Sequence, residues 1–452
     1  FDCQAKGVPY QKVYDEVSAQ RPDAVVIYST TFMRFEALDM IRSVRDIHPT
    51  ASIIVCGGHF HKMASEALEK VPEIDVILHD IPEESCEDLI NALDDRSSWN
   101  AIEGISFRQN GNEVHTPGRG KPKDFSRLNF DMGYFIDLNY YIEPLPYSTD
   151  IACLGVETSR GCQNECIFCE YSTFNYWRRP VNDILDEVEY LLRSYPIKGI
   201  RFTDRAFSTN LTWVNELCDE IERRNLKFQW YAAMNSNIPL QLLERLRQCG
   251  LYSLSFGVES GSFKILKLMK KPLNIEHTLD FAKKCHELGI KAYAFFMYSF
   301  PDETQSEIEE SHAFARKIIP YLEDISWTLT MIFPKTGLEE IARTRGVIPE
   351  DFDWFKPYVN ELSDLFHMID TIPAYRDTFS VNDLINFYGT QVALKLRLLI
   401  IRRQWRELVD LIAKSTIWEL ILKNILKNPS IILRYLSMVA REILKVSRTQ
   451  GS

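Results

Sequence analysis

The chain has 452 residues, of which 45% are hydrophobic and 25% are charged. This composition excludes a disordered chain, a collagen-like fibre and a small disulfide-stapled scaffold, and the length predicts two or three domains. The net charge of −11 argues against nucleic-acid binding as the main role. No uninterrupted apolar run approaches 18 residues, so we expect no membrane-spanning helix.

Most of the ten cysteines stand alone among apolar neighbours, as buried thiols do in a reducing compartment. Together with the lack of a basic-then-apolar signal segment, this predicts a cytoplasmic protein. Only Cys162, Cys166 and Cys169 cluster, and an odd number of thiols cannot be satisfied by pairing within the cluster.

The first predicted domain covers residues 1–125. Short β-branched runs at 24–29, 52–56 and 75–78 alternate with helix-like stretches. This pattern predicts a doubly wound α/β domain with a parallel sheet, whose ligand lies at the carboxyl ends of the strands. The loops at those ends contain Ser29 and Thr30 and then Gly57, Gly58 and His59. Because three strands make a small sheet and the chain begins with Phe1, we expect a preceding strand and helix to be missing.

A second α/β alternation covers residues 151–345, after a strand-like tail and a linker at 126–150. Helical patterns separate six strand candidates, which lie at 151–157, 199–203, 228–233, 252–257, 291–298 and 325–332. Six βα units in succession predict a partial barrel of the (βα)6, TIM-like kind, with its active site at the carboxyl ends of the strands.

The last region, 346–452, is predicted to be helical. Residues 395–448 carry twelve Lys or Arg against four Asp or Glu. One interpretation is a helical cap with a solvated basic face. The other is peripheral membrane contact through basic amphipathic helices.

The decisive sequence is TSRGCQNECIFC at 158–169, which directly follows the first barrel strand. Thiolates are soft ligands suited to iron–sulfur clusters or zinc. A structural zinc ion needs a fourth ligand, for instance His59 or Cys153. Three thiolates on a four-iron cluster would instead leave one iron open to a substrate.

The C-x3-C-x2-C spacing with Phe168 before the last cysteine resembles the radical S-adenosylmethionine (SAM) superfamily. The resemblance implies that Cys162, Cys166 and Cys169 hold a [4Fe-4S] cluster whose open iron chelates SAM. One electron from an external flavodoxin- or ferredoxin-type reductant would then cleave SAM to a 5′-deoxyadenosyl radical. Phe168 would lie near the adenine.

Further residues at the strand ends fit this resemblance. Glu259 stands where the family commonly places a polar contact to SAM, with Ser255 as a weaker candidate; the alternative for Glu259 is a surface carboxylate. Asp204 is either a site residue or a helix N-cap. Two motifs depart from the family pattern, since SFPDET begins with Ser299 where relatives often have glycine, and FPKTG stands where relatives often have Pro-Gly-Thr.

The N-terminal segments PDAVVIYSTTF and IIVCGGHFHKM resemble the cobalamin-binding domain attached to many radical SAM enzymes. The resemblance implies that Ser29, Thr30, Gly57, Gly58 and His59 contact cobalamin, with the two glycines admitting a bulky ligand because neither has a Cβ. Residues 80–83 depart from the family, which often has Gly-Glu-Gly-Glu there. No D-x-H-x-x-G motif is present, so no lower axial histidine is predicted.

The combined resemblance implies cobalamin-dependent methylation at an unactivated carbon of a small molecule or biosynthetic intermediate. One alternative is a radical SAM enzyme with a vestigial first domain that performs cyclisation, oxidation or rearrangement without cobalamin. A second is an iron–sulfur sensor or electron carrier, in which the protein would ligate every iron.

Overall fold

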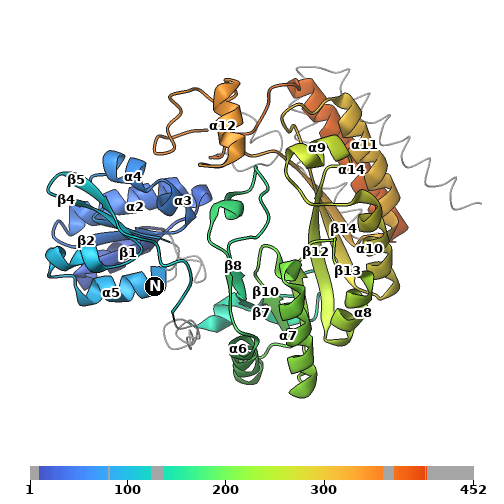
Figure 1. Cartoon of the computed structure of the whole chain (residues 1–452), viewed down its shortest axis with the longest axis horizontal. Coiled ribbons are helices and arrows are strands. Elements are labelled where there is room, and N and C mark those ends of the chain that lie inside the picture. The colour runs from blue at the N-terminus through green and yellow to red at the C-terminus, as the bar shows by residue number, and fades with distance from the viewer. Residues whose placement is uncertain (1–9, 80–81, 124–136, 360–370, 403, 405–452) are drawn as a thin grey trace, which may run out of the picture.

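The computed structural model describes residues 10–79, 82–123, 137–359, 371–402 and 404, which form two α/β bodies side by side (Figure 1). The basic segment after residue 404 lies outside the described residues, and so does most of the first half of the predicted linker.

The N-terminal body contains the predicted parallel sheet. Strands β1 (Ala24–Tyr28), β2 (Ser52–Cys56) and β3 (Val76–Leu78) pair in parallel, and between and around them run α1 (Tyr10–Gln20), α2 (Arg34–Ile47), α3 (Gly58–Lys62), α4 (Ala64–Lys70) and α5 (Pro82–Asn91). The sheet is larger than the three strands expected, because the strand-like tail forms an antiparallel hairpin of β4 (Ile105–Gln109) and β5 (Asn112–His115) beside β3. Asn110 and Gly111 make the turn with positive φ angles of 53° and 81°, as a tight hairpin requires.

The second body is the predicted partial barrel. Six strands pair in parallel in chain order, namely β7 (Ala152–Val156), β10 (Gly199–Phe202), β11 (Gln229–Ala233), β12 (Leu251–Glu259), β13 (Lys291–Tyr298) and β14 (Asp324–Leu329). The helices on the outside are α6 (Val181–Ser194), α7 (Leu211–Arg223), α8 (Leu240–Gln248), α9 (Phe263–Leu268), α10 (Ile275–Glu287) and α11 (Gln305–Ile318). A short antiparallel strand, β6 (Glu143–Pro144), extends the sheet beside β7, and β8 (Ser159–Arg160) pairs with β9 (Trp177–Arg178) at the rim.

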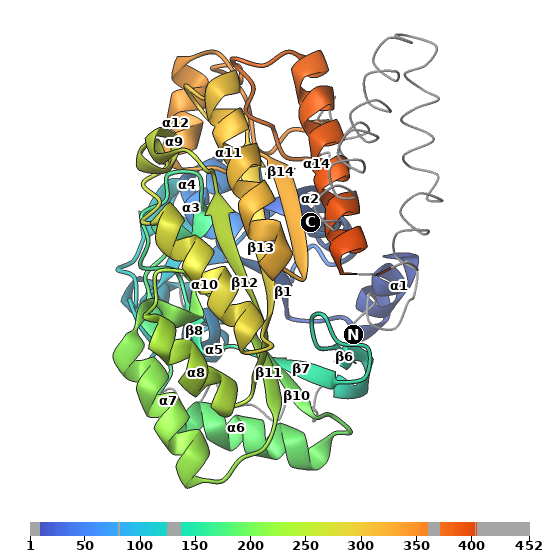
Figure 2. The same cartoon turned by 90° about the vertical axis from the view of Figure 1, so that its right-hand side faces the viewer.

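Among the described residues after the barrel, two α-helices are present, α12 (Gly337–Thr344) and α14 (Val381–Ile401). By length and composition α14 could cross a membrane. The sequence did not indicate this, because Asn386 and Thr390 interrupt the apolar residues of the helix. Half of its most apolar stretch is buried, and the helix packs against β14 and α11 (Figure 2). Part of α14 is therefore buried against the barrel.

A shared hydrophobic core joins the two bodies. It contains Ile53 of β2 and Phe60 of α3 together with Leu338 and Trp354 from the region after the barrel. At its centre lies Arg34, which is fully buried. Its guanidinium donates to the carbonyl oxygens of Thr31 at 2.8 Å, Trp354 at 2.9 Å and Thr371 at 2.6 Å. Burial lowers the pKa of Arg34 to about 10, so the side chain still carries its charge at neutral pH.

We predict that Arg34→Ala lowers the free energy of unfolding by about 3 kcal/mol, because three buried carbonyl groups lose a charged donor. Arg42→Ala is the matched control on the same helix, since the Arg42 side chain is 53% exposed and its ion pair with Asp39 is long, at 3.8 Å. We expect this variant to change the free energy of unfolding by less than about 0.5 kcal/mol. Urea denaturation measures both. Equal effects for the two variants would contradict a clamping role for Arg34.

Candidate functional site

The loop that carries the three clustered cysteines is held by backbone hydrogen bonds on both sides. Ile167 donates its N–H to the carbonyl of Met269 at 3.1 Å and accepts from the N–H of Leu338 at 3.0 Å. The Ser172 hydroxyl donates to the carbonyl oxygens of Cys166 at 3.1 Å and Cys169 at 2.7 Å. The loop conformation is therefore fixed by the protein itself, as a preorganised ligand set requires.

The three thiols lie near one another at the barrel rim and are free. Burial raises the pKa of Cys166 to about 11 and raises the pKa of Cys169, so deprotonation needs a compensating positive charge. In the part of the chain that the structure describes, no three His, Cys, Asp or Glu side chains are close enough to chelate one metal ion.

Glu259 lies beside this loop and is not a surface carboxylate, since it is 8% exposed. It ends β12 in the left-handed region at φ 64°, and its carboxylate meets the Lys271 ammonium at 3.0 Å. A Cβ on Gly257 would overlap this carboxylate, so any larger residue there would have to displace it. Burial alone would lower the pKa of Lys271, but the charges of Glu259 and Cys166 raise it. The ion pair therefore places a fixed positive charge next to Cys166.

Asp204 is 4% exposed and supports the start of the cysteine loop. It accepts hydrogen bonds from the hydroxyls of Thr158, at 2.6 Å, and Ser159. The alternative of a helix N-cap is wrong, because Asn210 caps α7 by accepting from the N–H of Trp213 at 3.1 Å.

The other two barrel candidates lie apart from one another. Ser255 is buried within the sheet, where its hydroxyl is 2.6 Å from that of Tyr231. Phe168 packs edge-on against Phe300 and belongs to the core shared by the two bodies.

In both motifs that depart from the family pattern, the residue at the glycine position has a positive φ. Ser299 has φ 67° and Lys335 has φ 59°, the left-handed conformation that glycine adopts without steric cost. The Ser299 hydroxyl donates a hydrogen bond to the carbonyl of Tyr375 at 2.8 Å.

A cavity of about 500 Å³ lies between the carboxyl ends of β1 to β3 and the loops after β7 and β10. Of the residues predicted to bind cobalamin, it is lined by Thr30, Gly57 and Gly58. Ser29 is buried behind it, with its carbonyl where a Cβ on Gly57 would be. His59 also lies outside the lining, packed against Trp354, and burial lowers its pKa to about 3.

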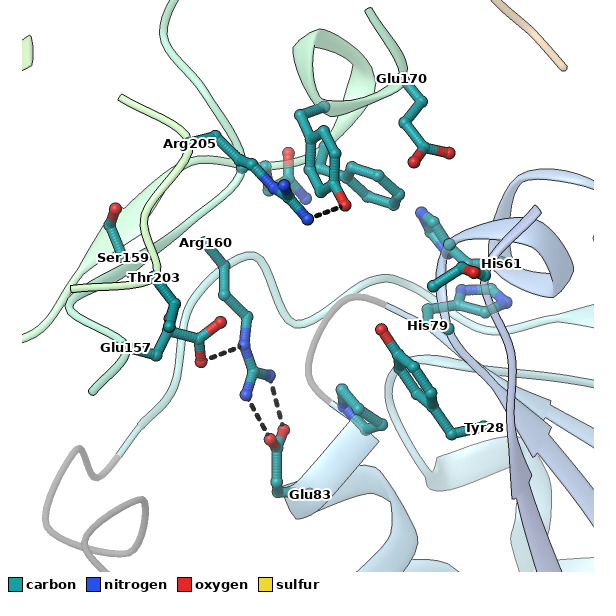
Figure 3. A pocket seen from close by; sticks show the side chains of 18 residues that line it. Tyr28, His61, His79, Glu83, Glu157, Ser159, Arg160, Glu170, Thr203 and Arg205 are labelled. Atoms are coloured by element: carbon teal, nitrogen blue, oxygen red, sulfur yellow. Dashed lines mark hydrogen bonds and ion pairs between the residues drawn. The ribbon is translucent and has the colours of Figure 1, made fainter. Parts of the chain in front are cut away.

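The cavity is crossed by an ion pair between the two bodies (Figure 3). Arg160, from the barrel rim, donates to both oxygens of Glu83 at 2.6 and 3.0 Å, and to Glu157 at 2.8 Å. Burial opposes the charge of Arg160, but these carboxylates raise its pKa above the usual value. Arg205 lies further along the wall, stacked on the ring of Tyr171 at 4.0 Å.

Sequence reasoning missed most of the cavity lining. The residues that it did not place there include Tyr28, His79, Glu83, Glu157, Arg160, Glu170 and Arg205. They come from loops of two domains, and a single sequence carries no signal that brings such loops together. The positions of His79 and Glu83 directly after β3 were the available hint.

Comparison with known proteins agrees with this geometry. Residues 156–315 match the radical SAM superfamily. An uncharacterized methyltransferase of Pyrococcus horikoshii is 26% identical over 355 residues, which are 77% of this chain and 75% of that protein. An anaerobic magnesium-protoporphyrin IX monomethyl ester cyclase of Cereibacter sphaeroides is 25% identical over 370 residues, 79% of this chain but 58% of the cyclase.

Among solved structures, the chain resembles OxsB, a cobalamin-dependent SAM radical enzyme, with aqua-cobalamin and SAM bound. The TM-score is 0.69 at 16% identity, and the match covers 100% of this chain and 75% of OxsB. At this identity the match shows a shared fold. The cysteine loop, the partial barrel and these similarities together show that residues 156–315 form a radical SAM domain, within a chain that shares the fold of OxsB.

Proposed function

We propose that this enzyme methylates an organic substrate with cobalamin as the methyl carrier. The observation that carries the proposal is the cavity itself, which the carboxyl ends of the first sheet share with the barrel rim that holds the cysteine loop. When bound, the [4Fe-4S] cluster and SAM supply a substrate radical, and cobalamin supplies the methyl group. The name of the methyltransferase of Pyrococcus horikoshii supports methylation, and the name of OxsB, a cobalamin-dependent SAM radical enzyme, supports cobalamin.

Cys162, Cys166 and Cys169 are the proposed cluster ligands. Their loop is anchored at both sides, and Lys271 offers the positive charge that offsets thiolate burial at Cys166. Glu259 holds Lys271 in place and is the proposed polar contact for SAM, with Phe168 on the adenine side. Asp204 and Ser255 are proposed to position the strands rather than to touch the cofactor, because their polar groups bond within the barrel.

The cavity fits one face of a large planar ligand. Its volume lies in the range of about 300–1,000 Å³ that is usual for small-molecule sites. The wall contributed by the N-terminal domain includes Thr30, Gly57 and Gly58. A Cβ on Gly58 would lie 3.0 Å from the Phe174 ring, so glycine leaves room there. The chain's own contribution would be to orient the ligand, to exclude water and to keep two reactive groups on opposite walls.

The second candidate is radical cyclisation, oxidation or rearrangement without cobalamin. Pro82 favours it, because a proline with a fixed φ stands where the family often has glycine, and the neighbouring Glu83 is already engaged by Arg160 across the cavity. The similarity to the cyclase points the same way. A cofactor-binding measurement separates the two candidates.

The proposed surroundings of the enzyme follow from its chemistry. A low-potential one-electron donor of the flavodoxin or ferredoxin type would reduce the cluster. The nine cysteines in the described residues are all free, which fits a reducing, cytoplasmic compartment. The substrate is proposed to be a small molecule, with no nucleic acid involved. Peripheral membrane contact through the basic C-terminal segment stays a prediction, since that segment lies outside the described residues.

We predict that Cys166→Ser abolishes both the visible absorbance of the anaerobically reconstituted cluster and the reductive cleavage of SAM to 5′-deoxyadenosine, because one iron loses its thiolate. Cys218→Ser, which alters a buried thiol on α7, should leave both unchanged. Cluster assembly without SAM cleavage in the unaltered enzyme would instead indicate an electron carrier or sensor.

We predict that Gly58→Leu weakens hydroxocobalamin binding at least tenfold, since the added side chain fills the cavity beside Phe174. Ala101→Leu adds the same bulk at an exposed position of the same domain and should change the affinity less than twofold. Absorbance titration under anaerobic conditions measures both. An unaltered enzyme that binds no cobalamin, while still cleaving SAM, would favour the second candidate.

A further inference from the structure

A chain of hydrogen bonds leads from the cavity through the first sheet to the protein surface. His79, which lines the cavity, has its Nε2 atom 2.6 Å from the hydroxyl of Ser106. The same hydroxyl is 2.7 Å from Nδ1 of His115. Nε2 of His115 then lies 3.2 Å from the hydroxyl of Ser65 and 3.3 Å from the Glu113 carboxylate.

The strand register produces this arrangement. Ser106 on β4 stands opposite Ile77 of β3 and opposite His115 of β5. His79 follows Ile77 by two residues and continues the ladder, since its N–H donates to the carbonyl of Gly104 at 2.9 Å. Side chains two residues apart on a strand share one face of the sheet. The hydroxyl of Ser106 therefore lies between two imidazoles on one face of the sheet.

The two ends of this series of hydrogen bonds differ in their access to water. Ser106 is fully buried, so its hydroxyl has no solvent to serve as donor or acceptor. The side chain of His115 is 41% exposed. A molecule that fills the cavity would cover His79 on the opposite side (Figure 3). Under those conditions Ser106 and His115 offer His79 a path to bulk protons.

We propose that His79, Ser106 and His115 form a proton relay between the cavity and the surface. When His115 is the cation, its Nδ1–H donates to Ser106, whose hydroxyl donates to Nε2 of His79. Transfer breaks the N–H bond of His115 and the O–H bond of Ser106, and it forms a new O–H bond on Ser106 and an N–H bond on His79. The positive charge moves inward by one imidazole and no other group is needed.

The shared hydroxyl also makes the two histidines interdependent. A serine hydroxyl has one hydrogen, so it can donate to only one of the two rings at a time. If both rings carry N–H groups that point at Ser106, its own buried hydrogen loses its acceptor, which disfavours the doubly charged state. The pair should therefore take up two protons in two separated steps.

Other charged and titratable groups surround the relay and enter its interpretation. The His61 ring on α3 lies 5.1 Å from that of His79. The Glu113 carboxylate lies 3.3 Å from His115. Arg108 stands opposite Glu113 in the register and donates to the carbonyl oxygens of Leu68, Pro72 and Ile74. Across the cavity, Glu83 is held by Arg160.

The test is a pH titration of the full chain labelled with 15N-histidine, without added cofactor, so its result does not depend on the proposed function. Spectra from pH 5 to pH 9 follow the ring nitrogens, and His→Gln variants assign the signals. We expect biphasic curves for His79 and His115, with midpoints separated by about one pH unit or more. In Ser106→Ala both curves should become monophasic.

Ser253→Ala is the matched control, because Ser253 is a fully buried serine of a barrel strand whose hydroxyl donates to the carbonyl of Pro146. It should keep the biphasic curves. His115→Gln gives a second route if Ser106→Ala fails to fold, and it should leave His79 with a single step. Independent monophasic titration of the two histidines in the unaltered chain, or curves that Ser106→Ala leaves unchanged, would overturn the relay.

Discussion

The constraint on which the whole structure depends is that two parallel sheets turn their carboxyl ends toward one cavity. Each sheet alone would place its ligand at that edge, and only a firm contact between the bodies lets the two ligand sites face each other. The contact is a shared apolar core with a buried arginine at its centre. Arg34 ties α2 to the segments around Trp354 and Thr371, which follow the barrel in sequence. The distance between the two walls of the cavity is thus set by buried hydrogen bonds rather than by a flexible linker.

The local pattern of the sequence was enough to predict both sheets. Continuous β-branched runs predicted the strands β1 to β3 and the six barrel strands with errors of at most two residues at each end, except that β14 ends at Leu329, three residues early. The spacing of Cys162, Cys166 and Cys169 indicated the chemistry, because few other metal sites use three thiols in one short loop. What failed was anything that depended on two distant segments. The hairpin of β4 and β5 was expected only as a tail, since its short, polar strand has no apolar alternation.

The cavity wall shows the same limit. Gly57 and Gly58 were visible as glycines that admit a ligand, but the pairing of Glu83 with Arg160 joins residues 77 positions apart and leaves no local trace. His59 was the histidine nearest to the glycines and was predicted to touch the ligand, yet the helix that starts at Gly58 turns it inward, and His61 lies at the cavity instead. A helix places residues two apart on different faces, and this alone decided between the two histidines.

The central claim is that three thiolates hold a four-iron cluster and leave one iron for SAM. Mössbauer spectroscopy of the anaerobically reconstituted, 57Fe-labelled enzyme tests it most directly. The account predicts a [4Fe-4S] spectrum in which one of the four iron sites shifts when SAM is added. A spectrum in which all four irons stay equivalent with SAM present, or a protein that retains zinc in place of iron, would contradict it.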